Sequence, residues 1–208
     1  MANAITAELI YEFLSGARVF AKAVRDVIEG AVLQEVAGNK LSVTQFKLLS
    51  LVAQTDFVTI GDAAAFLGVS SPAASKTVEK MVRRRLLRRA DIQEDRRSSQ
   101  LSLSEAGRRL IETYEKARDR KAAEIFSQYS PEVLRHTSEL LDKLASGIAG
   151  QRAGALSGET CVQCEIYYRP NCRFRQAGDV QCFYQLHRKG SGDQSVNSDE
   201  TSERKKED

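Results

Sequence analysis

The sequence predicts a mainly α-helical protein: a winged helix-turn-helix with long N- and C-terminal dimerisation helices and a small β-hairpin wing. Three observations support this fold class. Apolar residues recur every three or four positions through most of the first 150 residues, two short helices meet at a Gly-containing turn, and a period-two segment follows them. The 208 residues suffice for one such domain plus an appendage.

The first predicted element is one long helix over residues 4–36. Its apolar residues form a continuous stripe at helical spacing. A stripe of this length exceeds what one small domain can cover, so it requires a partner. The stripe comprises Ile5, Leu9, Phe13, Phe20, Val24, Val27, Ile28 and Val32.

Two capped helices follow. Ser42 and Gln45 form the pattern of a capping box, and this helix is expected to stop near Thr55. Thr59 opens the next helix, with an aspartate three residues on, and Gly68 ends it.

A fourth helix is predicted from Ser71 to about Leu87, with Pro72 in its first turn, where proline is tolerated. Its inward face comprises Ala74, Val78, Met81 and Val82. A short helix, a turn and a second helix with polar residues on its outward face together form the helix-turn-helix pattern.

A hairpin is expected next. Leu86, Leu87 and Arg89 lead into a polar tip over residues 90–98, and residues 100–103 alternate as a return strand. Two further amphipathic helices are predicted from Ser104 to Phe126 and from Ser130 to Ile148. The stripes on these helices and on the first helix predict a homodimer.

Charge is concentrated in one region of a nearly neutral chain. The net charge is +3, but residues 76–97 contain nine basic and four acidic side chains, which leaves −2 for the rest. A positive helix and hairpin in a helix-turn-helix is the electrostatic pattern of a protein that binds double-stranded DNA. The alternative is that these arginines are simply solvated.

The run LGVSSPAASKTVEKMVRRRLLRRADIQEDRRSSQLSLSEAG resembles the MarR family of winged-helix transcription factors. The resemblance covers about residues 5–148, and its most specific part is Asp95 and Arg97 followed by Leu101, Leu103 and Gly107. It implies a two-fold dimer on a pseudo-palindromic operator. Arg85 stands where the family commonly has glycine, so a non-glycine residue must end the recognition helix or the helix continues.

Candidate DNA contacts follow from the helical face and from the resemblance. Ser75 and Lys76 are expected to reach base edges, whereas Lys80 and Arg83 reach phosphates. The resemblance places Arg97 in the minor groove, with Asp95 orienting it or simply making a turn, and Arg96 at a phosphate or in solvent. The full candidate set is Ser71, Pro72, Ser75, Lys76, Lys80, Arg83, Asp95, Arg96 and Arg97.

The predicted organisation has four parts. Residues 1–150 form the winged-helix and dimerisation domain, and residues 151–160 form a Gly-punctuated linker. Residues 161–187 form a cysteine-rich metal or redox module. Residues 188–208 form a polar tail that contains one apolar residue and is expected to be disordered.

All four cysteines lie in that module, as Cys161, Cys164, Cys172 and Cys182. A Cys-x2-Cys pair can bring two thiolates to one metal, and the two later cysteines can complete a four-thiolate site. The irregular spacing favours an iron–sulfur cluster over structural zinc, and a thiol switch without metal is the third alternative. His187 is interpreted as a spare ligand or, more simply, as a tail residue.

Other function classes are disfavoured. There is no phosphate-binding loop, dinucleotide fingerprint or catalytic constellation, so an enzyme is not expected. No stretch is apolar enough for a membrane span, and no basic leader opens the chain, so a cytoplasmic location is expected.

The sequence therefore predicts a dimeric transcriptional repressor whose DNA affinity is coupled to the iron–sulfur or redox state of the cysteine module. The alternative is a regulator that responds to a small lipophilic effector, as the resemblance suggests, with the cysteines holding structural zinc. A third class, a winged helix that binds protein, is disfavoured by the positive charge.

Overall fold

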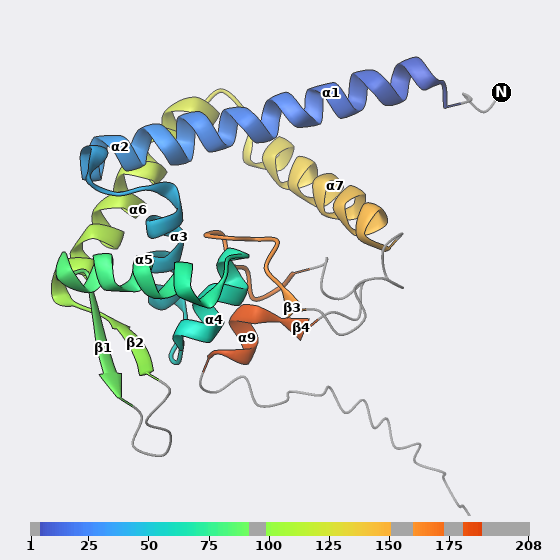
Figure 1. The fold of residues 1–208 in the computed structure, drawn as a ribbon. Helices are drawn as coiled ribbons and strands as arrows, with labels where there is room; N and C mark the ends of the chain where they lie inside the picture. The colour runs from blue at the N-terminus through green and yellow to red at the C-terminus, as the bar shows by residue number, and fades with distance from the viewer. Residues whose placement is uncertain (1–4, 92–98, 151–159, 173–180, 189–208) are drawn as a thin grey trace, which may run out of the picture.

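The computed structural model describes residues 5–91, 99–150, 160–172 and 181–188. Figure 1 shows a compact helical body, with the wing at one side and two long helices, α1 and α7, extending from the opposite side. In the described part of the chain, no helix combines the length and the apolar character needed to cross a bilayer.

The N-terminal helical arm has three consecutive parts, α1 (Ala7–Ala23), the π-helical segment η1 (Val24–Gly30) and α2 (Ala31–Ala37). The predicted long helix is therefore present, and the π-helical segment in its middle is a feature that the prediction did not include. The wider π turn shifts the register of the side chains. Ile28, Val32 and Leu33 enter the core, whereas no residue of α1 is buried.

The two capping boxes that the sequence predicts are present. After a 3₁₀ turn, η2 (Gly38–Lys40), Ser42 and Gln45 cap α3 (Val43–Gln54) reciprocally. Thr59 and Asp62 do the same for α4 (Ile60–Leu67), which ends at Gly68 in the left-handed conformation. These caps satisfy backbone N–H groups that have no partner within the helix.

Helix α5 (Ser71–Arg83) ends four residues earlier than the predicted boundary near Leu87. Arg85 adopts a φ of 58°, and its N–H donates to the carbonyl of Val82 while the N–H of Leu86 donates to that of Met81. This pair of bonds is a Schellman motif, in which glycine usually holds the left-handed position. A non-glycine residue therefore ends this helix.

The wing consists of β1 (Leu87–Asp91) and β2 (Ser99–Leu103), paired antiparallel from Leu87 opposite Leu103 to Asp91 opposite Ser99. Its base is fastened to the body because the Leu101 N–H donates to the Val58 carbonyl at 2.8 Å. Of the predicted tip, residues 90–98, Ala90 and Asp91 belong to β1 instead, and residues 92–98 lie outside the described residues.

The last two long helices, α6 (Glu105–Phe126) and α7 (Pro131–Gly150), agree with the prediction. Ser104 caps α6 by accepting the N–H of Gly107. Ile111 and Tyr114 of α6 join the core together with α3 and the base of the wing.

The cysteine-rich segment packs on this body. Two short strands, β3 (Thr160–Cys161) and β4 (Gln181–Cys182), pair in parallel, and a short helix α9 (Phe183–Leu186) follows. Ile166, Cys182, Phe183 and Tyr184 belong to the same buried cluster as the winged helix. The core therefore continues from the helices into the cysteine-rich segment.

Helix α9 docks on α4, as the adjacent ribbons in Figure 1 show. The Phe66 ring of α4 contacts the rings of Phe183 and Tyr184, with centroids 5.4 and 5.7 Å away. Tyr184 is fully buried. These aromatic pairs contribute beyond their buried area because their edges meet ring faces.

The interpretation of His187 as a tail residue is wrong, because it packs on the helical body. Its ring stacks on Phe183 at 4.2 Å, and its Nε2 lies 3.2 Å from the Asp62 carboxylate. Its backbone carbonyl accepts the N–H groups of Asp56 and Phe57. No sequence pattern marked this residue, because its partners on the winged helix, Asp56, Phe57 and Asp62, are more than 100 positions away.

His187 also affects the electrostatics of the α4 cap. Burial of the Asp62 carboxyl opposes its ionisation, but hydrogen bonds from the Thr59 hydroxyl and N–H and from His187 outweigh this effect. The pKa of Asp62 is consequently below its ordinary value. The cap and the docked segment therefore stabilise the same carboxylate.

We expect His187→Ala to lower the free energy of unfolding by about 1–2 kcal/mol, because the substitution removes a stacked ring and a partner of Asp62. Urea unfolding measures this change. The matched control is His136→Ala, since His136 is exposed on α7 and should change stability by less than about 0.5 kcal/mol. Equal effects of the two substitutions would contradict the docking described here.

Candidate nucleic-acid interface

The outward face of α5 carries the predicted contact residues. The buried face consists of Ala74, Val78 and Met81. The opposite face exposes Ser71, Pro72, Lys76, Lys80 and Arg83, and Ser75 is half-buried at its edge. Because one face is fixed in the core, these polar side chains are held in solvent as a single surface.

The adjacent strand extends the positive surface. Arg88 and Arg89 of β1 are exposed, and Arg89 lines a groove of about 390 Å³ together with Glu79 and Arg83 of α5. Both arginines belong to the basic run of residues 76–97 but were not among the predicted contacts. Successive side chains of a strand point to opposite sides, so the sequence alone did not show that both are exposed.

Glu79 is an acidic side chain within this cationic face. It is exposed and lies one turn from both Lys76 and Arg83. Repulsion from phosphates disfavours a carboxylate at a purely electrostatic DNA contact, whereas a carboxylate can accept a hydrogen bond from the cytosine amino group. Glu79 was not among the predicted contacts, although its spacing from Lys76 places it on the same face of the helix.

The three wing-tip candidates, Asp95, Arg96 and Arg97, lie outside the described residues. The structure describes the two strands that flank them in the chain, β1 and β2.

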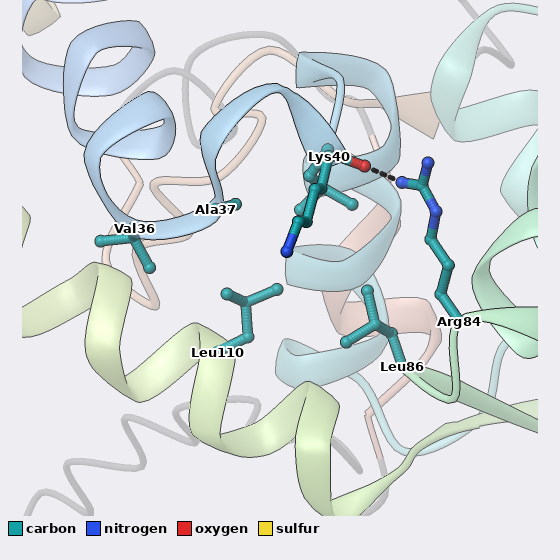
Figure 2. A pocket seen from close by; sticks show the side chains of 7 residues that line it. Val36, Ala37, Lys40, Arg84, Leu86 and Leu110 are labelled. Atoms are coloured by element: carbon teal, nitrogen blue, oxygen red, sulfur yellow. Dashed lines mark hydrogen bonds between the residues drawn. The ribbon is translucent and has the colours of Figure 1, made fainter.

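Arg84 has a structural role despite its place in the basic run. Its guanidinium donates to the Lys40 carbonyl and to Gln45 Oε1, which joins the end of α5 to the start of α3 (Figure 2). Arg84 is therefore oriented away from the contact face of α5.

Figure 2 also shows a pocket between α2, α6 and the α5–β1 turn. Its volume is about 430 Å³, within the range of pockets that bind small molecules. The lining is apolar except for Lys40 and Arg84. It comprises Val36, Ala37, Lys40, Leu41, Arg84, Leu86 and Leu110.

The cysteine-rich segment lies against several other elements. The Arg169 guanidinium makes two hydrogen bonds to the Asp142 carboxylate of α7, at 2.6 and 3.0 Å. Glu165 pairs with Lys47 of α3, and Gln54 of α3 donates to the Ile166 carbonyl at 3.1 Å. Arg118 of α6 lies 5.8 Å from the centre of the Tyr167 ring.

The four cysteines are gathered in this segment. Cys161 and Cys182 are register partners on β3 and β4, and all four thiols are free. Burial, together with the smaller effect of the nearby charges of Cys182, Cys161 and Cys172, raises the pKa of Cys164 to about 11. Within the described ranges, no three His, Cys, Asp or Glu side chains are arranged to hold a metal ion.

Comparison with known proteins agrees with this geometry. No curated protein matches the chain in sequence, but a sequence model of the MarR family matches residues 32–98. Members of that family are DNA-binding regulators and not enzymes.

Solved structures match the fold over a longer range. A MarR family protein from Bacillus stearothermophilus is 20% identical and has a TM-score of 0.59, over 70% of this chain and 99% of that one. RV1404 from Mycobacterium tuberculosis has the same identity and TM-score, over 69% and 95%. Sco3205, a MarR family transcriptional regulator from Streptomyces coelicolor in complex with DNA, is 20% identical with a TM-score of 0.53, over 70% and 94%. The chain therefore has a MarR-like winged-helix fold, and its residues 32–98 are similar to the MarR family in sequence.

Proposed function

We propose that the chain is a MarR-type transcriptional regulator that binds double-stranded DNA as a homodimer and acts as a repressor. The observation that carries this proposal is the exposed cationic face of α5 beside the wing, on a fold shared with a regulator solved in complex with DNA. Such a surface supplies phosphate contacts that hold the protein on the duplex, while the first half of α5 reads base edges.

The proposed dimer uses the helical arms. Every described residue of α1 is exposed, including Leu9, Phe13 and Phe20 on one face. Leu141 and Ile148 of α7 are also exposed. Apolar surface of this extent on a water-soluble body is typical of an interface. Pairing through α1 and α7 leaves the two copies of α5 free to read half-sites about 34 Å apart.

The cysteine-rich segment is proposed to couple its iron–sulfur or redox state to DNA affinity, because it contacts α3, α4, α6 and α7 together. A second candidate, an effector-responsive regulator with the cysteines holding zinc, is favoured by the pocket between the helical arm and the end of α5. Its apolar walls and two cations suit a small lipophilic anion. A ligand there would contact both the arm and the recognition helix.

Lys76→Ala, Lys80→Ala and Arg83→Ala should each weaken binding to a 30-bp duplex selected by the wild-type protein from a random library. We expect Lys80→Ala and Arg83→Ala to reduce the slope of log affinity against log salt by about 1 per protomer, since each removes a phosphate contact. Lys76→Ala should also relax base preference. Fluorescence anisotropy between 50 and 200 mM salt measures both effects.

Lys121→Ala on α6 is the control, because it removes one positive charge from an element outside the proposed surface. It should leave the affinity and the salt slope unchanged. If Lys121→Ala weakened binding as much as Lys80→Ala, the interface would not be the outward face of α5.

Phe13→Asp should convert the dimer into monomers at micromolar concentration, because it puts a charge into the apolar face of α1. Arg18→Asp introduces the same side chain on the opposite side of that helix and should leave the dimer intact. Light scattering after size exclusion measures the mass. A wild-type monomer, or dissociation of both variants alike, would refute the proposed interface.

For the pocket, the probe is 1-anilino-8-naphthalenesulfonate, an aromatic anion whose fluorescence rises in apolar surroundings. Leu110→Trp, which fills the pocket between α2 and α6, should reduce probe binding at least fivefold. Leu186→Trp, which adds the same bulk at an exposed position of α9 away from the pocket, should not. Equal probe binding by Leu110→Trp and wild type would exclude this pocket as the ligand site.

A further inference from the structure

The β3–β4 pair brings together two cysteines that are distant in sequence. Cys161 and Cys182 are register partners in a parallel pair, in which neighbouring chains lie about 4.8 Å apart and opposed side chains point to the same side. Cys182 is buried and Cys161 is half-buried. Two thiols held side by side in this way suit a shared metal.

The chain makes a tight turn from Cys161 to Cys164. The backbone N–H of Glu165 donates to the Val162 carbonyl at 3.2 Å, which closes this turn. Glu165, directly after Cys164, has a φ of 46°, which is unusual for a residue other than glycine. Turns with left-handed residues direct successive N–H groups at one point, as in many iron–sulfur sites. Strained positions of this kind cluster at ligand clamps.

The surroundings hold that strained residue in place. Lys47 pairs with the Glu165 carboxylate, and the Tyr184 hydroxyl donates to its carbonyl oxygen. The rings of Tyr168 and Tyr184, one from each half of the segment, pack with their centroids 5.0 Å apart. The two halves of the segment, residues 160–172 and 181–188, therefore meet around the cysteines.

We propose that Cys161, Cys164, Cys172 and Cys182 ligate one thiolate metal centre, an iron–sulfur cluster or a zinc ion, which joins the two halves of the segment. On binding, each thiol loses its proton to solvent and the sulfur donates to the metal, so no oxidant is required. The four sulfurs are not arranged around one point in the structure, so metal binding must draw them together.

This metal centre stabilises the position of α4 relative to α3 and α7. The half that contains Cys161, Cys164 and Cys172 is fastened to α3 and α7 through Glu165 and Arg169. The half that contains Cys182 packs on α4 through the rings of Phe183 and Tyr184. A metal that joins the two halves therefore connects α4 to α3 and α7, and loss of the metal removes this connection. The consequence for DNA binding rests on the proposed function.

The first test is metal and sulfide analysis of the full-length protein purified without oxygen, with loading by ferrous iron plus sulfide or by zinc as separate arms. We expect either a brown protein that absorbs at about 400 nm, which identifies an iron–sulfur cluster, or a colourless protein with one zinc per chain. Cys164→Ser and Cys182→Ser should each lose at least 80% of the metal. His187→Ala, which loosens α9 without removing a ligand, should keep it.

Wild-type protein that holds less than about 0.1 metal per chain after both loading arms would overturn the proposal. Full metal retention by either serine variant would overturn the four-ligand site. If the variants do not fold, the wild-type protein is compared before and after its metal is removed with a chelator. Metal removal should accelerate amide hydrogen exchange of α4 at least fivefold and leave exchange in α1 unchanged. Identical exchange with and without metal would overturn the proposed connection between the metal centre and α4.

Duplex affinity is measured separately on the same samples. Metal removal should weaken it about five- to 150-fold, the usual range of coupling between two sites. An unchanged affinity would overturn the link from the metal centre to α4. If the metal-loaded protein did not bind duplex DNA, the proposed function would fail, whereas the metal content would still decide the four-cysteine site.

Discussion

The burial of one face of α5 is the constraint on which the rest of the arrangement depends. Ala74 and Met81 are fully buried and Val78 nearly so. Because a helix cannot bury one side without exposing the other, this packing fixes Lys76 and Lys80 in solvent on the opposite side. The Schellman motif at Arg85 then turns the chain directly into β1, which keeps the wing beside α5.

The same core extends into the cysteine-rich segment. Phe66 of α4 packs on the winged helix on one side and on Phe183 and Tyr184 on the other. Helix α4 therefore has two supports, one from the winged helix and one from a segment more than 110 residues later in the chain. Helices α4 and α5 pack directly on each other. The proposed coupling between the cysteine-rich segment and DNA binding depends on this shared packing.

Local patterns in the sequence predicted most of the winged helix. The two capping boxes, the glycine end of α4 and the apolar face of α5 each depend on residues within a few positions, so they could be recognised directly. The end of α5 was misplaced because only tertiary contacts, such as the Ser104 hydroxyl donating to the Arg85 carbonyl, keep a non-glycine residue at positive φ. The π turn at Val24–Gly30 had no local signal either.

The candidate site was predicted unevenly for the same reason. The cationic face of α5 followed from helical spacing, and its exposure agrees with that analysis. The roles of Arg84 in joining α5 to α3 and of His187 in supporting Asp62 depend on contacts between distant segments, which residue spacing does not encode. The clustering of the cysteines in sequence indicated a common site, but only the β3–β4 register pairs Cys161 with Cys182.

The most direct test of the central claim is lysine acetylation of the full-length protein with and without duplex DNA, quantified by mass spectrometry. If the outward face of α5 contacts DNA, the duplex should reduce acetylation of Lys76 and Lys80 at least fivefold and leave Lys121 unchanged. Equal acetylation of Lys76 and Lys80 in the free and DNA-bound protein would contradict the account.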